Sequence, residues 1–166
     1  AQRALKEGAS DAETLRRAKL TGAFSGGLRS NLVRMLDVVG ANHYLGVESC
    51  ACVFEPSHAH LVHTTSVLRN PVFVDGANYN GTPAMLSTPM LRRQLEEVCA
   101  TEMNALGDAL LLPLGPKVHE ALNHLAMQGL IDGARVLPAM PHPSGANNER
   151  IGYFLGTKPA DLPSQK

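Results

Sequence analysis

The chain of 166 residues contains no tryptophan, and aromatic residues make up only 4% of it. A broad aromatic platform for stacking bases is therefore excluded. The chain also lacks an excess of either charge, because fifteen basic residues balance fifteen acidic ones. Strong non-specific binders of polyanions are usually basic, so we expect any contact with nucleic acid to be local.

Long apolar runs are missing as well. No segment approaches the roughly 18 residues of a membrane span, and the first residues lack the apolar region of a signal peptide. The three cysteines are Cys50, Cys52 and Cys99, an odd number without the spacing of a disulfide framework. These features predict a cytoplasmic protein without a membrane partner, whose thiols are reduced and pack in the interior.

Hydrophobic residues account for 44% of the chain and charged residues for 18%, which is typical of a globular protein. The length predicts one domain over residues 1–156, beginning with a helical segment over 1–20. We expect the remaining residues, 157–166, to form a polar tail, and the protein to be a monomer.

Apolar residues at helical spacing alternate with short β-branched or apolar runs. We expect helices over 28–39, after Thr88–Pro89, after Gly115–Pro116 and over 151–155. We expect buried strands over 60–68, 108–114 and 134–140, and a long loop over 70–86.

This alternation predicts an α/β fold: a single-domain, three-layer sandwich whose short, mostly parallel central sheet is flanked by helices. Ligands of such folds bind beyond the carboxyl ends of the strands. Three loops would converge there, near residues 66–70, 115–117 and 142–148.

The most informative stretch is Met140-Pro-His-Pro-Ser-Gly-Ala-Asn-Asn-Glu-Arg150. Prolines stiffen the turn between a strand and a helix, so His142 would be held rigidly at the strand end. A helix N-terminus that follows Ser144 and Gly145 suits a phosphate, and a histidine beside it can donate to an oxygen that gains negative charge. The alternative is a structural turn with a capping serine and an exposed histidine.

The ordered set of Phe24, HTTSVLRNP, LLLPLGPKVHEAL and VLPAMPHPSGANNERI resembles the uracil-DNA glycosylase superfamily over roughly residues 22–156. The resemblance implies hydrolysis of the N-glycosidic bond of uracil, or a related damaged base, after the base is flipped out of DNA. It implies no metal or organic cofactor, and DNA containing the lesion as partner.

The resemblance assigns a role to each matching residue. His142 would be catalytic and bond to the carbonyl oxygen of uracil. Phe24 would stack on the flipped base, and Thr65 and Ser66 would read its edge. DNA contacts would come from eight residues: Gly115, Lys117, Pro143, Ser144, Gly145, Asn147, Asn148 and Arg150.

The chain departs from that family in three ways. Ser66 stands where an asparagine is usual, which predicts a broader range of lesions. Three cysteines, with Asn70 near the place of a fourth ligand, argue against an iron–sulfur cluster. The usual first strand, with its water-activating residue, is not seen. Asp11 lies at a suitable interval before Phe24, but its setting favours a surface helix.

Other interpretations stay open. The histidines at 58, 60 and 63 resemble a metal cluster, but strand geometry would point His63 away from the other two. A non-catalytic nucleic-acid-binding relative would keep the loop around His142 without activating water. An unrelated α/β hydrolase could use His142 as a base, although the chain has no G-x-S-x-G, P-loop or G-x-G-x-x-G motif.

Overall fold

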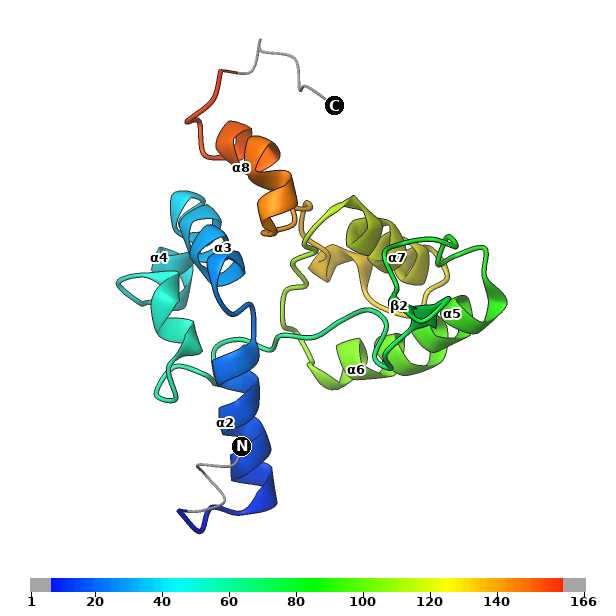
Figure 1. Ribbon diagram of the computed structural model, residues 1–166, viewed down its shortest axis with the longest axis horizontal. Coiled ribbons are helices and arrows are strands. Elements are labelled where there is room, and N and C mark those ends of the chain that lie inside the picture. Colours follow the sequence, from blue (N-terminus) through cyan, green and yellow to red (C-terminus); the bar gives the residue numbers. More distant parts are fainter. Residues whose placement is uncertain (1–6, 160–166) are drawn as a thin grey trace. The chain divides into compact units, whose positions relative to one another are not determined.

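The computed structural model describes residues 7–159, and helices form most of the regular structure in that range (Figure 1). The chain divides into two compact units. The first unit comprises residues 7–64 and 143–159, and the second comprises residues 65–142. The expectation of one domain over residues 1–156 stays a prediction.

The expected three-layer sandwich with a mostly parallel sheet is wrong. Within residues 7–159 the only sheet is a two-stranded antiparallel hairpin of β1 (Phe73–Val74) and β2 (Ala77–Asn78). The hairpin lies in the segment expected to be a loop. The run over 60–68, expected to be a buried strand, consists of bends and irregular backbone. No other segment of residues 7–159 pairs with it to form a ladder.

The first unit contains α2 (Asp11–Gly22), α3 (Gly27–Val38), α4 (Ala41–Leu45), the 3₁₀ helix η1 (Cys50–Phe54), the short 3₁₀ turn η4 (Gly145–Asn147) and α8 (Asn148–Phe154). Helix α2 begins at a serine cap, because the Ser10 hydroxyl accepts a hydrogen bond from the Glu13 N–H at 3.3 Å. Buried apolar residues join the elements into a core: Leu32, Met35, Cys50, Val53 and Ile151.

Arg29 ties three elements of the first unit together. Its guanidinium donates to the carbonyl oxygens of Leu20 at 2.8 Å and Ala23 at 2.6 Å. These bonds satisfy carbonyls at the end of α2 that lack intrahelical partners. The same guanidinium lies 4.4 Å from the centre of the Phe54 ring, a cation–π distance. The turn between α2 and α3 and the end of η1 are therefore held by one side chain.

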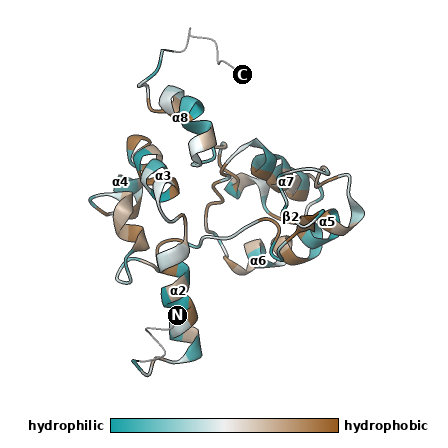
Figure 2. Ribbon diagram, in the orientation of Figure 1, coloured by the Kyte–Doolittle hydropathy of each residue, from teal (hydrophilic) through white to brown (hydrophobic). Residues whose placement is uncertain are grey.

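The second unit contains one long helical stretch, in which α5 (Pro89–Arg93) leads through the π-helical turn η2 (Gln94–Cys99) into α6 (Ala100–Ala105). It also contains α7 (Pro116–Met127) and η3 (Gly133–Arg135). Figure 2 shows hydrophobic and hydrophilic residues alternating along α5 and α7, as one buried face requires. The core consists of these residues: Leu95, Cys99, Ala100, Met103, Leu111, Ala121, Leu122, Leu125 and Ile131.

Two cysteines are buried, which permits a test by thiol labelling. Burial, with a smaller effect of Asp37, raises the pKa of Cys50 to about 12. Burial, with a smaller effect of Glu102, raises the pKa of Cys99 to about 11. At pH 8 both thiols are therefore protonated, and only a thiolate reacts quickly. We expect one thiol per chain to react with a thiol reagent in the native protein, that of the half-buried Cys52. All three thiols should react once the protein is unfolded. Fast labelling of Cys50 or Cys99 in the native state would contradict this burial.

Candidate functional site

The second unit does contain two of the expected strand segments, residues 111–114 and 136–140, paired in parallel. Two bridges join them, Leu111 with Val136 and Leu114 with Met140. The Leu137 N–H donates to the Leu111 carbonyl at 2.9 Å, and the Gly115 N–H to the Met140 carbonyl at 2.7 Å. We call these residues the parallel pair. Because the two segments are parallel, their carboxyl ends lie side by side. Helix α7 connects the end of the first segment to the second.

Gly115 and His142 meet at that end of the parallel pair. Gly115 is the N-cap of α7 and has φ +96°, a conformation that favours glycine. A Cβ on Gly115 would lie 3.3 Å from the Cβ of His142. The side chain of His142 is exposed. The absence of a side chain at Gly115 therefore lets the histidine lie directly beside the start of a twelve-residue helix.

Lys117 belongs to the same end of α7. It lies in the first helical turn, where N–H groups have no intrahelical acceptor. Its Nζ is 3.4 Å from the Glu120 carboxylate, and 70% of its side chain is exposed. An exposed pair of this kind contributes little to stability, so the ammonium group can exchange Glu120 for another anion. Gly115, Lys117 and His142 are the predicted site residues that the second unit brings together.

Gly115→Ala tests whether this close approach matters. The added Cβ would meet His142, and alanine at φ +96° would be strained by about 1–3 kcal/mol. We expect a loss of that size in the free energy of unfolding, measured by urea denaturation. Gly129→Ala is the matched control for strain alone, because Gly129 has φ +69° with no atom within 4 Å of its added Cβ. Equal effects on both would show that His142 does not press on position 115.

The other two predicted residues of the second unit lie at its beginning. The Thr65 hydroxyl donates to the Glu102 carboxylate at 3.0 Å and accepts a hydrogen bond from Arg69 at 3.1 Å. Arg69 also lies 3.5 Å from Glu102. Thr65 therefore takes part in a local polar cluster, whereas the Ser66 side chain is exposed. Their contact with a base stays a prediction.

The segment after His142 belongs to the first unit, where it packs on α3. The Asn31 side chain donates to the Pro143 carbonyl at 3.0 Å and to the Asn148 side-chain oxygen at 3.4 Å. Asn147 donates to the Ser144 hydroxyl at 2.9 Å. The turn is thus held by amide groups, and Asn31 is a contributor that the sequence did not reveal, because one polar residue on an exposed helix face gives no signal.

The remaining side chains of this segment differ in exposure. Pro143 is fully buried, so its ring stiffens the turn from inside. Gly145, Asn148 and Arg150 are exposed, and the Arg150 guanidinium lies 3.5 Å from the Asn147 side-chain oxygen. The exposed residues are the ones that can reach a ligand.

Phe24 and Asp11 also lie in the first unit. Phe24 occupies the turn between α2 and α3 with φ +51°, an uncommon conformation for a residue with a side chain. Its stacking on a base stays a prediction. Asp11 is exposed in the first turn of α2, where a carboxylate favours the helix dipole. That position agrees with the surface-helix interpretation and gives no support to a role in activating water.

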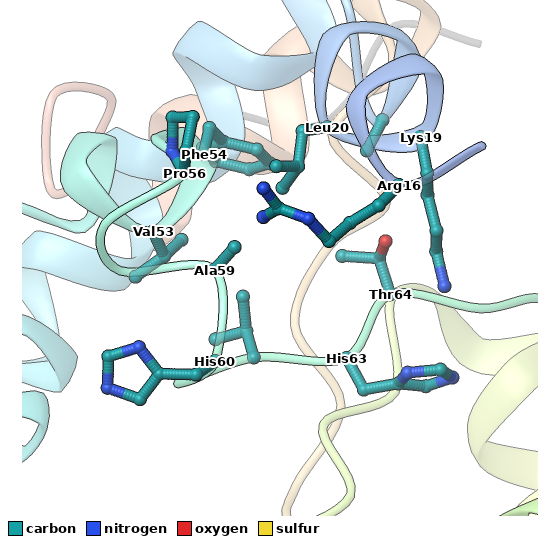
Figure 3. A pocket seen from close by; sticks show the side chains of 12 residues that line it. Arg16, Lys19, Leu20, Val53, Phe54, Pro56, Ala59, His60, His63 and Thr64 are labelled. Atoms are coloured by element: carbon teal, nitrogen blue, oxygen red, sulfur yellow. The ribbon is translucent and has the colours of Figure 1, made fainter. Parts of the chain in front are cut away.

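A pocket of about 340 Å³ lies in the first unit, and sequence reasoning missed it. Figure 3 shows Arg16 and Lys19 extending from α2 on one side of the pocket. His60, His63 and Thr64 lie on the segment that follows η1. The residues come from two stretches that lie 30 positions apart and share no motif, so the sequence gives no sign of them. Within residues 7–159 no group of three metal-ligating side chains is present, the histidines at 58, 60 and 63 included.

The comparisons with known proteins carry little functional information. An uncharacterised protein of Bacillus subtilis strain 168, YoxB, is 37% identical over 142 residues. The match covers 84% of this chain and 55% of that protein, so the chain spans about half the length of its curated relative. No family model matches the chain. No solved structure matches it either.

Proposed function

We propose that the protein is a DNA glycosylase, which hydrolyses the N-glycosidic bond of uracil or a related deaminated base in DNA. The observation that supports it best is the meeting of His142 with Gly115 at the N-terminus of α7. The His142 imidazole, a hydrogen-bond donor, then lies beside the α7 N-terminus, which can bind an anion. That combination suits a reaction on a phosphate-linked substrate in which negative charge develops.

The chemistry follows from where the charge goes. When the bond between C1′ and the base breaks, its electron pair leaves with the base, which becomes an anion. His142 would donate a hydrogen bond to the carbonyl oxygen that carries this charge. Water then adds to C1′, and its proton passes to solvent or to the departing base. The α7 N-terminus and Lys117 would hold a phosphate of the same strand.

The turn over 143–150 would contribute further DNA contacts. Asn31 holds its backbone in one conformation, which lowers the ordering cost of binding. Gly145, Asn148 and Arg150 are exposed and offer an open backbone, an amide and a cation. Ser144 and Asn147 would shape the turn through their own hydrogen bond, and Pro143 would act by stiffening it.

The test is incubation of the full chain with a labelled duplex that carries one uracil, followed by alkali to cleave abasic sites. Strand cleavage at the uracil, and none in a matched thymine duplex, is the expected result. Binding without cleavage would instead favour a non-catalytic nucleic-acid-binding relative. If the protein neither binds nor cleaves the uracil duplex, an unrelated hydrolase would be favoured.

The setting of this activity is part of the proposal. Within residues 7–159, no helix is long and apolar enough to cross a membrane. We further propose a cytoplasmic location and a monomeric protein, in line with the reduced thiols expected of its cysteines.

A further inference from the structure

The pocket of the first unit has a floor and a rim of different chemistry. We call its apolar lining residues the floor: Leu20, Ala23, Val53, Phe54, Pro56, Ala59 and Val62. The polar residues that line it are basic or neutral, with Arg16 and Lys19 on α2 and His60 and Thr64 across from them (Figure 3). None of the described residues that line the pocket is acidic. A ligand with a flat apolar body and a negative group would match both regions.

Arg16 and Lys19 leave α2 on the same side, because residues three apart in a helix are neighbours. The Arg16 guanidinium lies toward Leu20 and Phe54, whereas the Lys19 ammonium points toward Thr64 (Figure 3). Glu13 accepts hydrogen bonds from Arg16 Nε at 2.7 Å and Nη2 at 3.0 Å. Hydrogen bonds from Arg16 and Arg17 lower the pKa of Glu13 to about 2, so this carboxylate stays ionised and holds the guanidinium in place. Within the described part of the chain, no carboxylate lies within ion-pair distance of Lys19. Its charge is therefore available to a ligand.

The floor is also fixed in advance. The Arg29 guanidinium lies against the Phe54 ring, and its hydrogen bonds to Leu20 and Ala23 fix the turn that borders the pocket. At about 340 Å³, the volume falls at the lower end of that found for small-molecule sites. A single ring system with one charged substituent is the size of ligand that fits.

We propose that this pocket binds a phosphate monoester of a ring compound, with the ring on the apolar floor and the phosphate at Lys19. A phosphate is favoured over a carboxylate because two cationic side chains and the imidazoles of His60 and His63 border the pocket, which suits a group of up to two negative charges. The chemistry is shared by aryl phosphates and nucleoside monophosphates. The site does not include His142, and the proposal does not depend on the glycosylase activity.

Calorimetric titration of the full chain tests the proposal with two probes, phenyl phosphate and uridine 5′-monophosphate. We expect saturable binding of at least one probe. Inorganic phosphate alone, and phenol or uridine alone, should each bind about tenfold more weakly than the corresponding probe. Tighter binding of phenyl phosphate would assign the site to small aryl phosphates. Tighter binding of uridine monophosphate would assign it to nucleotides.

Two substitutions locate the site. Lys19→Gln removes an exposed charge and should weaken binding about tenfold, while Ala59→Phe should fill the floor and abolish it. Arg34→Gln is the matched control, because it removes one positive charge from an exposed position on α3 of the same unit. Circular dichroism of each variant establishes that it is folded.

Three results would overturn the proposal. The first is no saturable binding of either probe at millimolar concentration to the folded wild-type protein. The second is unchanged affinity in Lys19→Gln and in a folded Ala59→Phe. The third is loss of binding in His142→Ala, which would assign the probes to the second unit. The uracil-excision assay is scored separately, so failure of one proposal leaves the other standing.

Discussion

His142→Ala should lower the single-turnover rate of uracil excision by about 10²–10³-fold, the loss found when one preorganised donor to a developing charge is removed. The affinity for uracil-containing duplex should stay nearly unchanged, because the interaction is made in the transition state and not in the ground state. Gel-based cleavage under enzyme excess, beside a binding titration by fluorescence anisotropy, measures both quantities.

His43→Ala is the control for this substitution. His43 is exposed on α4 of the first unit and lies outside the proposed site. Its loss should change neither quantity. Unchanged excision in His142→Ala would remove the histidine from the mechanism. An equal fall in affinity and rate would make it a DNA-binding residue and not a catalytic one.

Arg135→Met should destabilise the second unit by about 3 kcal/mol. The Arg135 side chain is buried, with 9% of its surface exposed. Its Nε donates to the Ala109 carbonyl at 2.9 Å and its Nη2 to the Met103 carbonyl at 3.0 Å. A hydrogen bond to a charged group contributes roughly 1.5–3 kcal/mol, and methionine would leave both carbonyls without this donor.

Urea denaturation followed by circular dichroism gives the free energy of unfolding for this comparison. Arg93→Met is the control, since 76% of the Arg93 side chain is exposed and its ion pair with Glu97 is a surface pair. A change within about 0.5 kcal/mol is expected there. A similarly small change in Arg135→Met would mean that water replaces the guanidinium at both carbonyls.

Arg135 also bears on the proposed site. Its backbone carbonyl accepts the Leu111 N–H at 2.8 Å, so the residue whose side chain is buried also bonds to the first residue of the parallel pair. The register of that pair places Met140 opposite Leu114, and His142 follows two residues later. Loss of excision in Arg135→Met would therefore accompany loss of stability, whereas His142→Ala should leave stability unchanged.

Local signals in the sequence determined most of the helices. Helical spacing of apolar residues predicted α3, and Gly40, in a left-handed conformation, lies just beyond its end. Proline at the first position predicted the starts of α5 and α7, and both are confirmed. The Thr88 hydroxyl before α5 donates to the Ala84 carbonyl and makes no capping bond to the helix. These features depend on neighbours within a few residues, which is why the sequence could reveal them.

The parallel pairing of 111–114 with 136–140 was also foreseeable. Two apolar runs separated by an amphipathic helix are typical of such a crossover, and the structure places Gly115, Lys117 and His142 at its carboxyl end. The third expected strand, over 60–68, does not form although its composition suits one, because no other segment of the described residues pairs with it. A ladder needs hydrogen bonds between distant segments, and one segment's composition does not specify them.

Tertiary structure alone decided the rest. The side chain of Asn31 reaches Pro143, 112 positions later, and Arg29 joins α2 to Phe54. The pocket over α2 exists only because residues 53–64 fold back along Arg16 and Lys19. Each of these contacts joins polar or aromatic residues that are unremarkable in their own stretch of sequence. Periodicity and capping specify how a segment folds, but the packing of one segment on another decides which side chains meet.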